Sequence, residues 1–320
     1  MRRFLIIAAF LICLSGCNFI PLYDLEGNVM IILDYQLEQQ VSVRAGFDPA
    51  GVAAFNEKVH GKLPEHIQVQ FYETGTHTLV KDEFLDTFGG MMDVPSGNYD
   101  VLIYSLGTKA TEVDGSTLDG KYAATKQSSR TYEIGTYRNV ITEPDHLYLA
   151  TVSNVEIAPV KNDIDTITTV RDTAASILST WTIEWLNVEG LGYIAECEMF
   201  LTSQKGRAYL WGNRAGNQVG ALKISAYPDF NGKRLYSIFN TFGRSADFTR
   251  DVAAVLRVTN TAGKEYIFDF DVTDQFDDPD NTGHNLVIDH AITIPDDGGG
   301  GSGEFDPVVN PWWDPIIISE

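Results

Sequence analysis

The chain has 320 residues, of which 44% are hydrophobic and 21% charged, so it is neither a disordered polyelectrolyte nor a multi-span membrane protein. Its 23 Lys and Arg residues against 44 Asp and Glu residues give a formal net charge of −21. Binding to nucleic acid depends on basic side chains that neutralise phosphates, so nucleic acid is excluded as a partner. At about 100–200 residues a domain, the length predicts two globular domains.

The first 17 residues have the form of an export signal that ends in a lipidation site. Two arginines precede an apolar run over residues 4–14, which is too short to span a bilayer as a helix. Small residues Ser15 and Gly16 follow and would let a peptidase approach, while the thiol of Cys17 would accept a diacylglyceryl group. An ordinary signal peptide with an incidental cysteine is the alternative. We expect residues 1–16 to be removed and lipid on Cys17 to hold the chain at an outer membrane, in a leaflet that the sequence does not define.

Only one further cysteine remains after this processing, because Cys13 would be discarded with the signal peptide. Cys197 lies in an alternating segment over residues 193–199. A buried small hydrophobe is therefore favoured over a nucleophile, and no internal disulfide is expected.

Apolar residues alternate with period two from Gly27 onward, which predicts an all-β and mostly antiparallel chain. The residues expected to share the inner faces of strands are, in chain order, Val29, Ile31, Leu33 and Tyr35; Ile67, Val69 and Phe71; Tyr99, Val101 and Ile103; Leu222, Ile224 and Ala226; and Tyr266, Phe268 and Phe270. We expect two tandem β-sandwiches with Greek-key connections. Residues 49–59, with Asp48 as N-cap, predict one short helix, and residues 172–178 are left open between helix, loop and strand.

The residue types in the turn before the third of these strands can be explained physically. In Pro95-Ser96-Gly97-Asn98-Tyr99, Gly97 is expected to accept a positive φ. Tyr99 is expected to pack its ring inward while its hydroxyl reaches the backbone.

These strands and the segments after them divide the chain into five parts. A signal peptide over 1–16 is followed by sandwiches over 17–152 and 153–295, a Gly-rich linker over 296–303 and a tail over 304–320. The tail has a proline at every fourth position, which makes it a poor continuous strand. We expect it to pack in cis or on the sheet edge of a partner, through its apolar residues Phe305, Val308, Val309, Trp312, Trp313, Ile316, Ile317 and Ile318.

No pattern in the chain predicts catalysis, a cofactor or a metal site. The six histidines are scattered, and no pair of them has metal-ligand spacing. A sugar-stacking surface is the more serious alternative, with candidate residues Trp181, Trp185, Trp211, Trp312 and Trp313 together with Tyr193, Tyr209 and Tyr236. Trp181 and Trp185 alternate with Ile183 on one strand face, however, which fits a buried core stripe better.

Several short motifs together carry a resemblance to a known family. They include Ser15-Gly16-Cys17, the run from Val94 to Leu102, Trp185 to Leu191, and Phe268 to Gln275. The chain resembles Bacteroidales lipoproteins with fimbrillin-like, transthyretin-like β-sandwich domains, the group of FimB/Mfa-type fimbrial anchor and accessory subunits. It is most similar to a lipoprotein family with a domain of unknown function.

The resemblance implies assembly or anchoring of a surface fimbria, with fimbrial subunits as partners and no catalysis. Fimbrillin subunits polymerise by strand exchange, in which the C-terminal strand of one subunit fills the groove of another, and the tail could play this role. Stalk subunits are cut after an arginine, which would be Arg44 here, but that cut would release the chain from its lipid and is not expected. The alternative is an outer-membrane lipoprotein that binds glycans.

Overall fold

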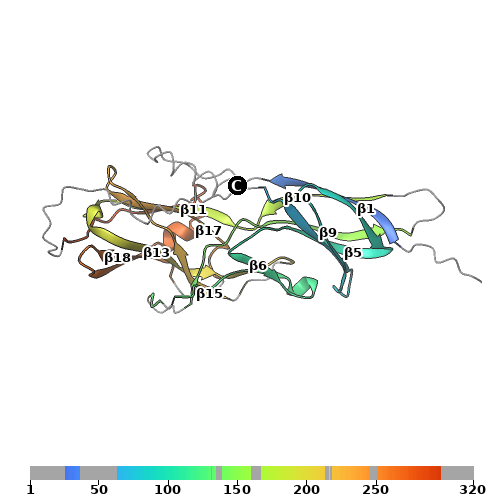
Figure 1. The fold of residues 1–320 in the computed structure, drawn as a ribbon, viewed down its shortest axis with the longest axis horizontal. Helices are drawn as coiled ribbons and strands as arrows, with labels where there is room; N and C mark the ends of the chain where they lie inside the picture. The colour runs from blue at the N-terminus through green and yellow to red at the C-terminus, as the bar shows by residue number, and fades with distance from the viewer. Residues whose placement is uncertain are drawn as a thin grey trace, which may run out of the picture.

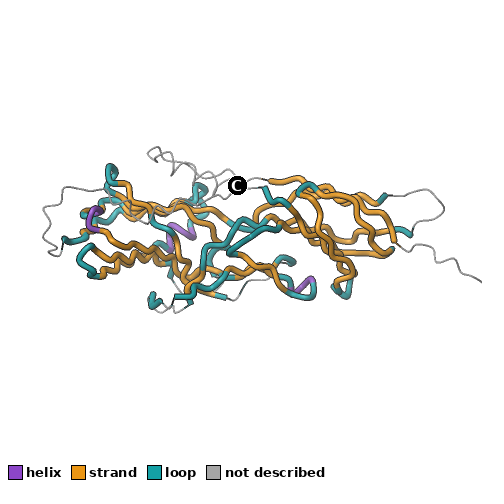
Figure 2. The backbone as a smooth tube through the Cα atoms, in the orientation of Figure 1, coloured by secondary structure: helices purple, strands orange, loops and turns teal. Residues whose placement is uncertain are grey.

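The computed structural model describes residues 26–36, 63–130, 132–134, 139–159, 167–212, 216, 218–245 and 251–296. These residues form an elongated molecule that consists almost entirely of strands and loops (Figure 1, Figure 2). The described helical segments are three short turns: η1 (Leu118–Gly120), η2 (Leu191–Tyr193) and α3 (Thr273–Asp277). The all-β prediction is therefore confirmed.

One end of the molecule is a closed barrel of seven strands. Their order around the barrel is β1 (Glu26–Gln36), β10 (Thr168–Ser176), β9 (Tyr148–Ile157), β5 (Gly97–Ser105), β2 (His66–Glu73), β3 (Leu79–Asp86) and β4 (Gly89–Pro95). The predicted pair of tandem transthyretin-like sandwiches is not confirmed, because these strands close on themselves. The predicted boundary between residues 152 and 153 falls inside β9, and β10 pairs with both β9 and β1.

The inner faces of the barrel strands are those that alternation predicted. Val29, Ile31 and Leu33 of β1 are buried in the barrel core, as are the inward residues of β2 and β5. The Tyr99 hydroxyl donates a hydrogen bond to the carbonyl of Pro95 at 3.0 Å, as expected. Gly97, in contrast, does not have the positive φ that the sequence suggested. A Cβ at this position would lie 2.9 Å from the Tyr99 hydroxyl, so a larger residue would displace the Tyr99 ring.

A small sheet covers part of the outer wall of the barrel. It contains β14 (Arg207–Tyr209), β7 (Tyr122–Thr125) and β6 (Thr111–Asp114) in that order. Beneath it the outward residues Tyr72, Leu102 and Tyr104 are buried in a second apolar cluster. Both faces of β5 are therefore covered.

The other end of the molecule has two sheets that share one core. The four-stranded sheet contains β16 (Tyr227–Asp229), β17 (Arg234–Thr241), β11 (Ser179–Trp185) and β20 (Asn285–Ile288). The five-stranded sheet contains β19 (Glu265–Asp271), β18 (Ala253–Asn260), β13 (Ile194–Lys205), β15 (Val219–Ile224) and β8 (Val140–Ile141). A short parallel pair, β12 (Val188–Glu189) with β21 (Ile292–Thr293), completes this end. Trp185, Phe239, Leu222 and Leu256 from both sheets meet in the core.

The segment between β5 and β9 links the two ends. It leaves the barrel after Ser105, forms β6, β7 and β8, and returns to the barrel at Tyr148. Along the way β8 pairs in parallel with β15 of the distant sheet, with Val140 opposite Ala221. A connection between two neighbouring barrel strands is thus built into the other half of the molecule, with β6 lying between the two ends in Figure 1.

Candidate assembly surface

The two sites that the sequence predicted for membrane attachment and assembly, Cys17 and the tail over 304–320, lie outside the described residues. The same holds for the predicted helix over 49–59 and for Arg44. The described part of the chain begins with β1 at Glu26, nine residues after Cys17.

β1 is an integral strand of the barrel. It pairs antiparallel with β4, where Val29 lies opposite Met92, and parallel with β10, where Val29 lies opposite Thr168. Its inward side chains have almost no solvent exposure, and those of Ile31 and Leu33 belong to the barrel core. Removing β1 would therefore expose the core between β4 and β10.

The barrel has a weak seam between β3 and β4. Within these fully described strands, β3 and β4 are joined through Asp86 opposite Gly89, next to the tight turn that connects them. β3 pairs with β2 along its length, from His66 opposite Asp86 to Tyr72 opposite Leu79. The far edge of β3 over residues 79–85 has no strand partner among the described residues, which is unusual for a strand in a closed barrel.

Several exposed apolar side chains lie on β3 and β4 or close to them in the chain. Phe84 is 65% exposed and Phe88 is 62% exposed, far more than large apolar residues in a folded core. The other exposed large apolar residues of the same region are Leu63, Leu79, Val80 and Met91. Because exposed apolar groups that cluster mark interaction sites, the seam is the described surface best suited to protein contact.

Charged groups surround these apolar residues and are mostly acidic. The carboxylate of Asp82 accepts hydrogen bonds from Gln68 at 2.5 Å and Gln70 at 3.1 Å on the outer wall. On the inner side Lys81 and Glu83 form an ion pair at 3.2 Å. The seam therefore presents negative charge outward and a neutralised pair inward.

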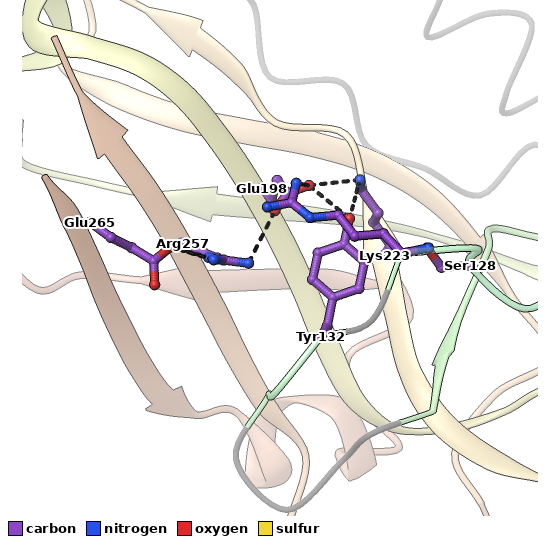
Figure 3. A network of polar contacts seen from close by, with 7 residues as sticks. Ser128, Tyr132, Glu198, Lys223, Arg257 and Glu265 are labelled. Atoms are coloured by element: carbon purple, nitrogen blue, oxygen red, sulfur yellow. Dashed lines mark hydrogen bonds and ion pairs between the residues drawn. The ribbon is translucent and has the colours of Figure 1, made fainter. Parts of the chain in front are cut away.

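A polar network fixes the linking segment onto the five-stranded sheet (Figure 3). At its centre, Glu198 of β13 accepts hydrogen bonds from Lys223 of β15 at 2.8 Å and from the Tyr132 hydroxyl at 2.9 Å. Arg130 and Arg257 lie within ion-pair distance of the same carboxylate, at 3.3 Å and 3.8 Å. The network joins residues of the linking segment to three strands and has a structural role.

The electrostatics of this network favour the charged forms of both central groups. Burial alone would raise the pKa of Glu198, but hydrogen bonds from Lys223 and Tyr132 and the nearby positive charges outweigh burial and lower it. Burial would likewise lower the pKa of Lys223, but its bonds to Glu198 and Tyr132 raise it. The pair is thus ionised across the whole neutral range.

The aromatic candidates for a sugar surface do not form one platform. Trp181 and Trp185 are buried in the core of the second end, as the alternating pattern favoured. Tyr209 lies on β14 in edge contact with Tyr122, and Trp211 packs against the apolar cluster beneath that sheet. The remaining candidates are the half-exposed Tyr193 and Tyr236, and Trp312 and Trp313 outside the described residues.

The other chemical candidates are also structural. Cys197 is buried, and burial followed by the charge of Glu198 raises the pKa of its thiol to about 12. In the described ranges no group of three or more His, Cys, Asp or Glu side chains is placed to hold a metal ion. No helix among the described residues has the length and apolar character needed to cross a bilayer.

Sequence reasoning missed the seam itself. Phe84, Phe88 and Met91 resemble core residues in the sequence, and nothing in a strand pattern says that β3 and β4 separate beyond their turn. The only available signal was the group of acidic residues among them.

Comparison with known proteins gives one family and several relatives. A family model described as a domain of unknown function, DUF5119, matches residues 35–221. A Bacteroides ovatus protein named "Putative fimbrium anchoring subunit Fim4B" is 25% identical over 154 residues, which are 48% of this chain and 40% of that relative. The matched region of the chain thus spans 40% of the length of this curated relative.

The chain was also compared with solved structures. The chain is similar to the "crystal structure of a putative adhesin" from Bacteroides ovatus, with a TM-score of 0.59 at 18% identity over 88% of this chain and 99% of that one. It also matches the fimbrial anchor protein Mfa2 from Porphyromonas gingivalis, with a TM-score of 0.49 at 12% identity over 81% of this chain and 90% of that one. The first of these likenesses establishes a shared fold.

Proposed function

We propose that this chain is a fimbrial anchor or accessory subunit that acts by protein–protein assembly, as the name of its curated relative suggests. The chain belongs to the family of the domain of unknown function DUF5119, whose match covers more than half of its length. The family match and the relative named as a fimbrium anchoring subunit confirm the resemblance that the sequence motifs predicted. The proposed subunit is not an enzyme and takes no cofactor. Its place is the outer membrane, through lipid on Cys17.

The position of β1 carries this proposal. A subunit that receives a donor strand needs an empty groove, but here β1 fills its place between β4 and β10 with residues of the same chain. Eight residues lie between Cys17 and the start of β1 at Glu26, and an extended chain of that length spans at most about 30 Å. Lipid on Cys17 would therefore hold the barrel close to the membrane.

The opposite end of the molecule is then free to face other subunits. β18 and β13 lie at the end away from β1 in Figure 1, and the last described residue, Asp296, follows the short β21 strand of the same half. The proposal keeps the linker over 296–303 and the tail over 304–320, but it does not keep the boundary at residue 152, which falls inside β9. In this proposal the apolar tail contacts a neighbouring fimbrial subunit.

Two variants test the anchor and the tail separately. Cys17→Ala should abolish labelling with radioactive palmitate and release both the chain and its fimbriae from the outer membrane, whereas Cys13→Ala in the discarded signal serves as the matched control. Deletion of residues 304–320 should leave the chain in the membrane but remove fimbrial subunits from its purified complex, whereas deletion of linker residues 298–303 should not. Fimbriae that stay attached in both cases would refute the proposal.

Two of the aromatic candidates for the glycan-binding alternative, Trp181 and Trp185, are core residues, as the alternating pattern favoured. Titration calorimetry of the full chain with saccharides at millimolar concentration is the direct measurement, and saturable heat would support this alternative.

A further inference from the structure

The unpaired edge of β3 has the features of a docking site for a strand. Over residues 79–85 its backbone N–H and C=O groups on the side away from β2 have no strand partner among the described residues. Such an edge is a template for an additional strand, because the backbone groups of a partner can complete the ladder. The position is distinct from β1, which is already paired on both sides.

The outer face of β3 defines which side chains a partner strand would meet. The outward residues Gln68 and Gln70 of β2 lie opposite Phe84 and Asp82 of β3. A register shift follows between Phe71 and Tyr72, and the exposed Val80 stands two positions before Asp82 on β3. β3 therefore presents an acidic residue between two exposed apolar ones. A strand added beside β3 is stabilised when its own outward residues are apolar, basic and apolar in that order, since opposite charges and apolar pairs favour cross-strand neighbours.

The inner side of the seam makes this edge selective. Lys81 and Glu83 point toward the inner side and form their ion pair there, where a core strand would carry apolar residues. Inward charges on an edge disfavour the addition of a purely apolar strand. A partner strand with small polar residues at its inward positions meets no such penalty.

Charge also disfavours the tail of this chain as the partner strand. The tail over 304–320 has four acidic residues and no basic residue, and the whole chain has a net charge of −21. Either would place like charge against Asp82 and its acidic surroundings. We infer that the β3 edge of this protein binds an extended segment of a different protein, in which a basic residue stands between two apolar residues at alternate positions.

A synthetic peptide tests this inference directly on the full-length lipidated chain in detergent. The probe is an acetylated and amidated Ser-Val-Thr-Lys-Thr-Val-Ser peptide, which places Val, Lys and Val on one face and Thr on the other. Binding is measured by titration calorimetry or fluorescence anisotropy. We expect saturable binding, a loss of about fivefold or more when the lysine is replaced by glutamate, and complete loss when alternate backbone amides are N-methylated.

Variants of the protein then show where on its surface the peptide binds. Phe84→Ser should weaken binding about two- to fivefold, and Asp82→Lys should reverse the preference so that the glutamate peptide binds better. Ile267→Ser is the matched control, because Ile267 is 55% exposed on β19, which is also the outermost strand of its sheet. Circular dichroism verifies that each variant is folded.

Three outcomes would overturn the inference. The first is an absence of binding at millimolar peptide, which would also result if another segment of this chain occupied the edge. The second is unchanged affinity of the N-methylated peptide, since contact would then be through side chains alone. The third is sensitivity to Ile267→Ser but not to Phe84→Ser, which would place the strand on β19. None of them bears on the lipid anchor or the tail.

Discussion

The Tyr132 hydroxyl donates a hydrogen bond of 2.9 Å to the carboxylate of Glu198, although the two residues are 66 positions apart in the chain. Tyr132 belongs to the segment between two barrel strands, and Glu198 lies on a strand at the other end of the molecule. The ring of Tyr132 also packs edge-on against Phe200, with 5.2 Å between the ring centroids. A polar and an apolar contact thus fasten the linking segment to the distant sheet.

Substitution of Tyr132 by phenylalanine tests this fastening. The change retains the ring contact with Phe200 but removes the donor to an ionised carboxylate, so the free energy of unfolding should fall by about 1.5–3 kcal/mol. Urea unfolding followed by circular dichroism measures the loss. Tyr193→Phe is the control, because Tyr193 is 41% exposed, and it should change the stability by less than about 0.5 kcal/mol. Equal effects would contradict a specific role for the hydroxyl.

The same network predicts a pH dependence with a defined sign. The pKa of Glu198 lies below its ordinary value of 4.5 in the folded chain, so its contribution to stability is complete above that value and is lost as the pH falls through the folded pKa. The pKa of Lys223 lies above its ordinary 10.5, so its contribution is present below that value and is lost only in strong alkali. The network should therefore stabilise the fold evenly across the neutral range.

Glu198→Gln tests the part of this pH dependence that lies on the acidic side, where protonation of Glu198 lowers the stability. The stability difference from the unmodified chain should be constant between about pH 6 and 9 and should shrink as the pH falls below about 4.5. Glu196→Gln, an exposed residue on the same strand, gives the control curve. A difference that grows as the pH falls would show that the pKa shift has the opposite sign.

The sequence predicted local structure well because alternation reports which face of a strand is buried. Val29, Ile31 and Leu33 lie inward as expected, and the Tyr99 hydroxyl reaches the backbone. Residues 172–178, which were left open, belong largely to β10, since parallel pairing with β1 decides their conformation. Such a pairing between residues far apart in the chain leaves no local pattern, and for this reason barrel closure could not be predicted.

The sequence could not predict the covered outer wall of the barrel or the weak seam between β3 and β4, for a related reason. Leu102 and Tyr104 are buried on the outer face because β7 and η1 lie over them, and a period-two pattern does not show what covers a face. Phe84 has the same apolar character but no cover among the described residues, so it is exposed. Which of two apolar faces meets solvent depends on the arrangement of distant segments.

Closure of the barrel depends on a glycine at the turn into β4. Gly89 has φ +100°, and a Cβ there would clash with the backbone carbonyl of Ile31 on β1. Gly75 has φ +93° but has no atom within 4 Å of the same position. Alanine at either site should cost about 1 kcal/mol through backbone strain, and at Gly89 it should cost at least about 1 kcal/mol more. Thermal or urea unfolding of the two variants measures the difference, and equal losses would mean that β4 can move away from β1 without cost.

The buried thiol of Cys197 gives a final prediction about reactivity. Only the thiolate attacks alkylating reagents, and burial, followed by the charge of Glu198, raises the pKa of this thiol to about 12. At pH 8 iodoacetamide should therefore leave Cys197 unmodified in the native chain and modify it fully in urea, as read by mass spectrometry of the peptide that contains it. Glu196→Cys places an exposed thiol one position away and should react at pH 8 without denaturant. If Cys197 reacted as fast as this control, β13 would have to open readily, and its place at the centre of the five-stranded sheet would be contradicted.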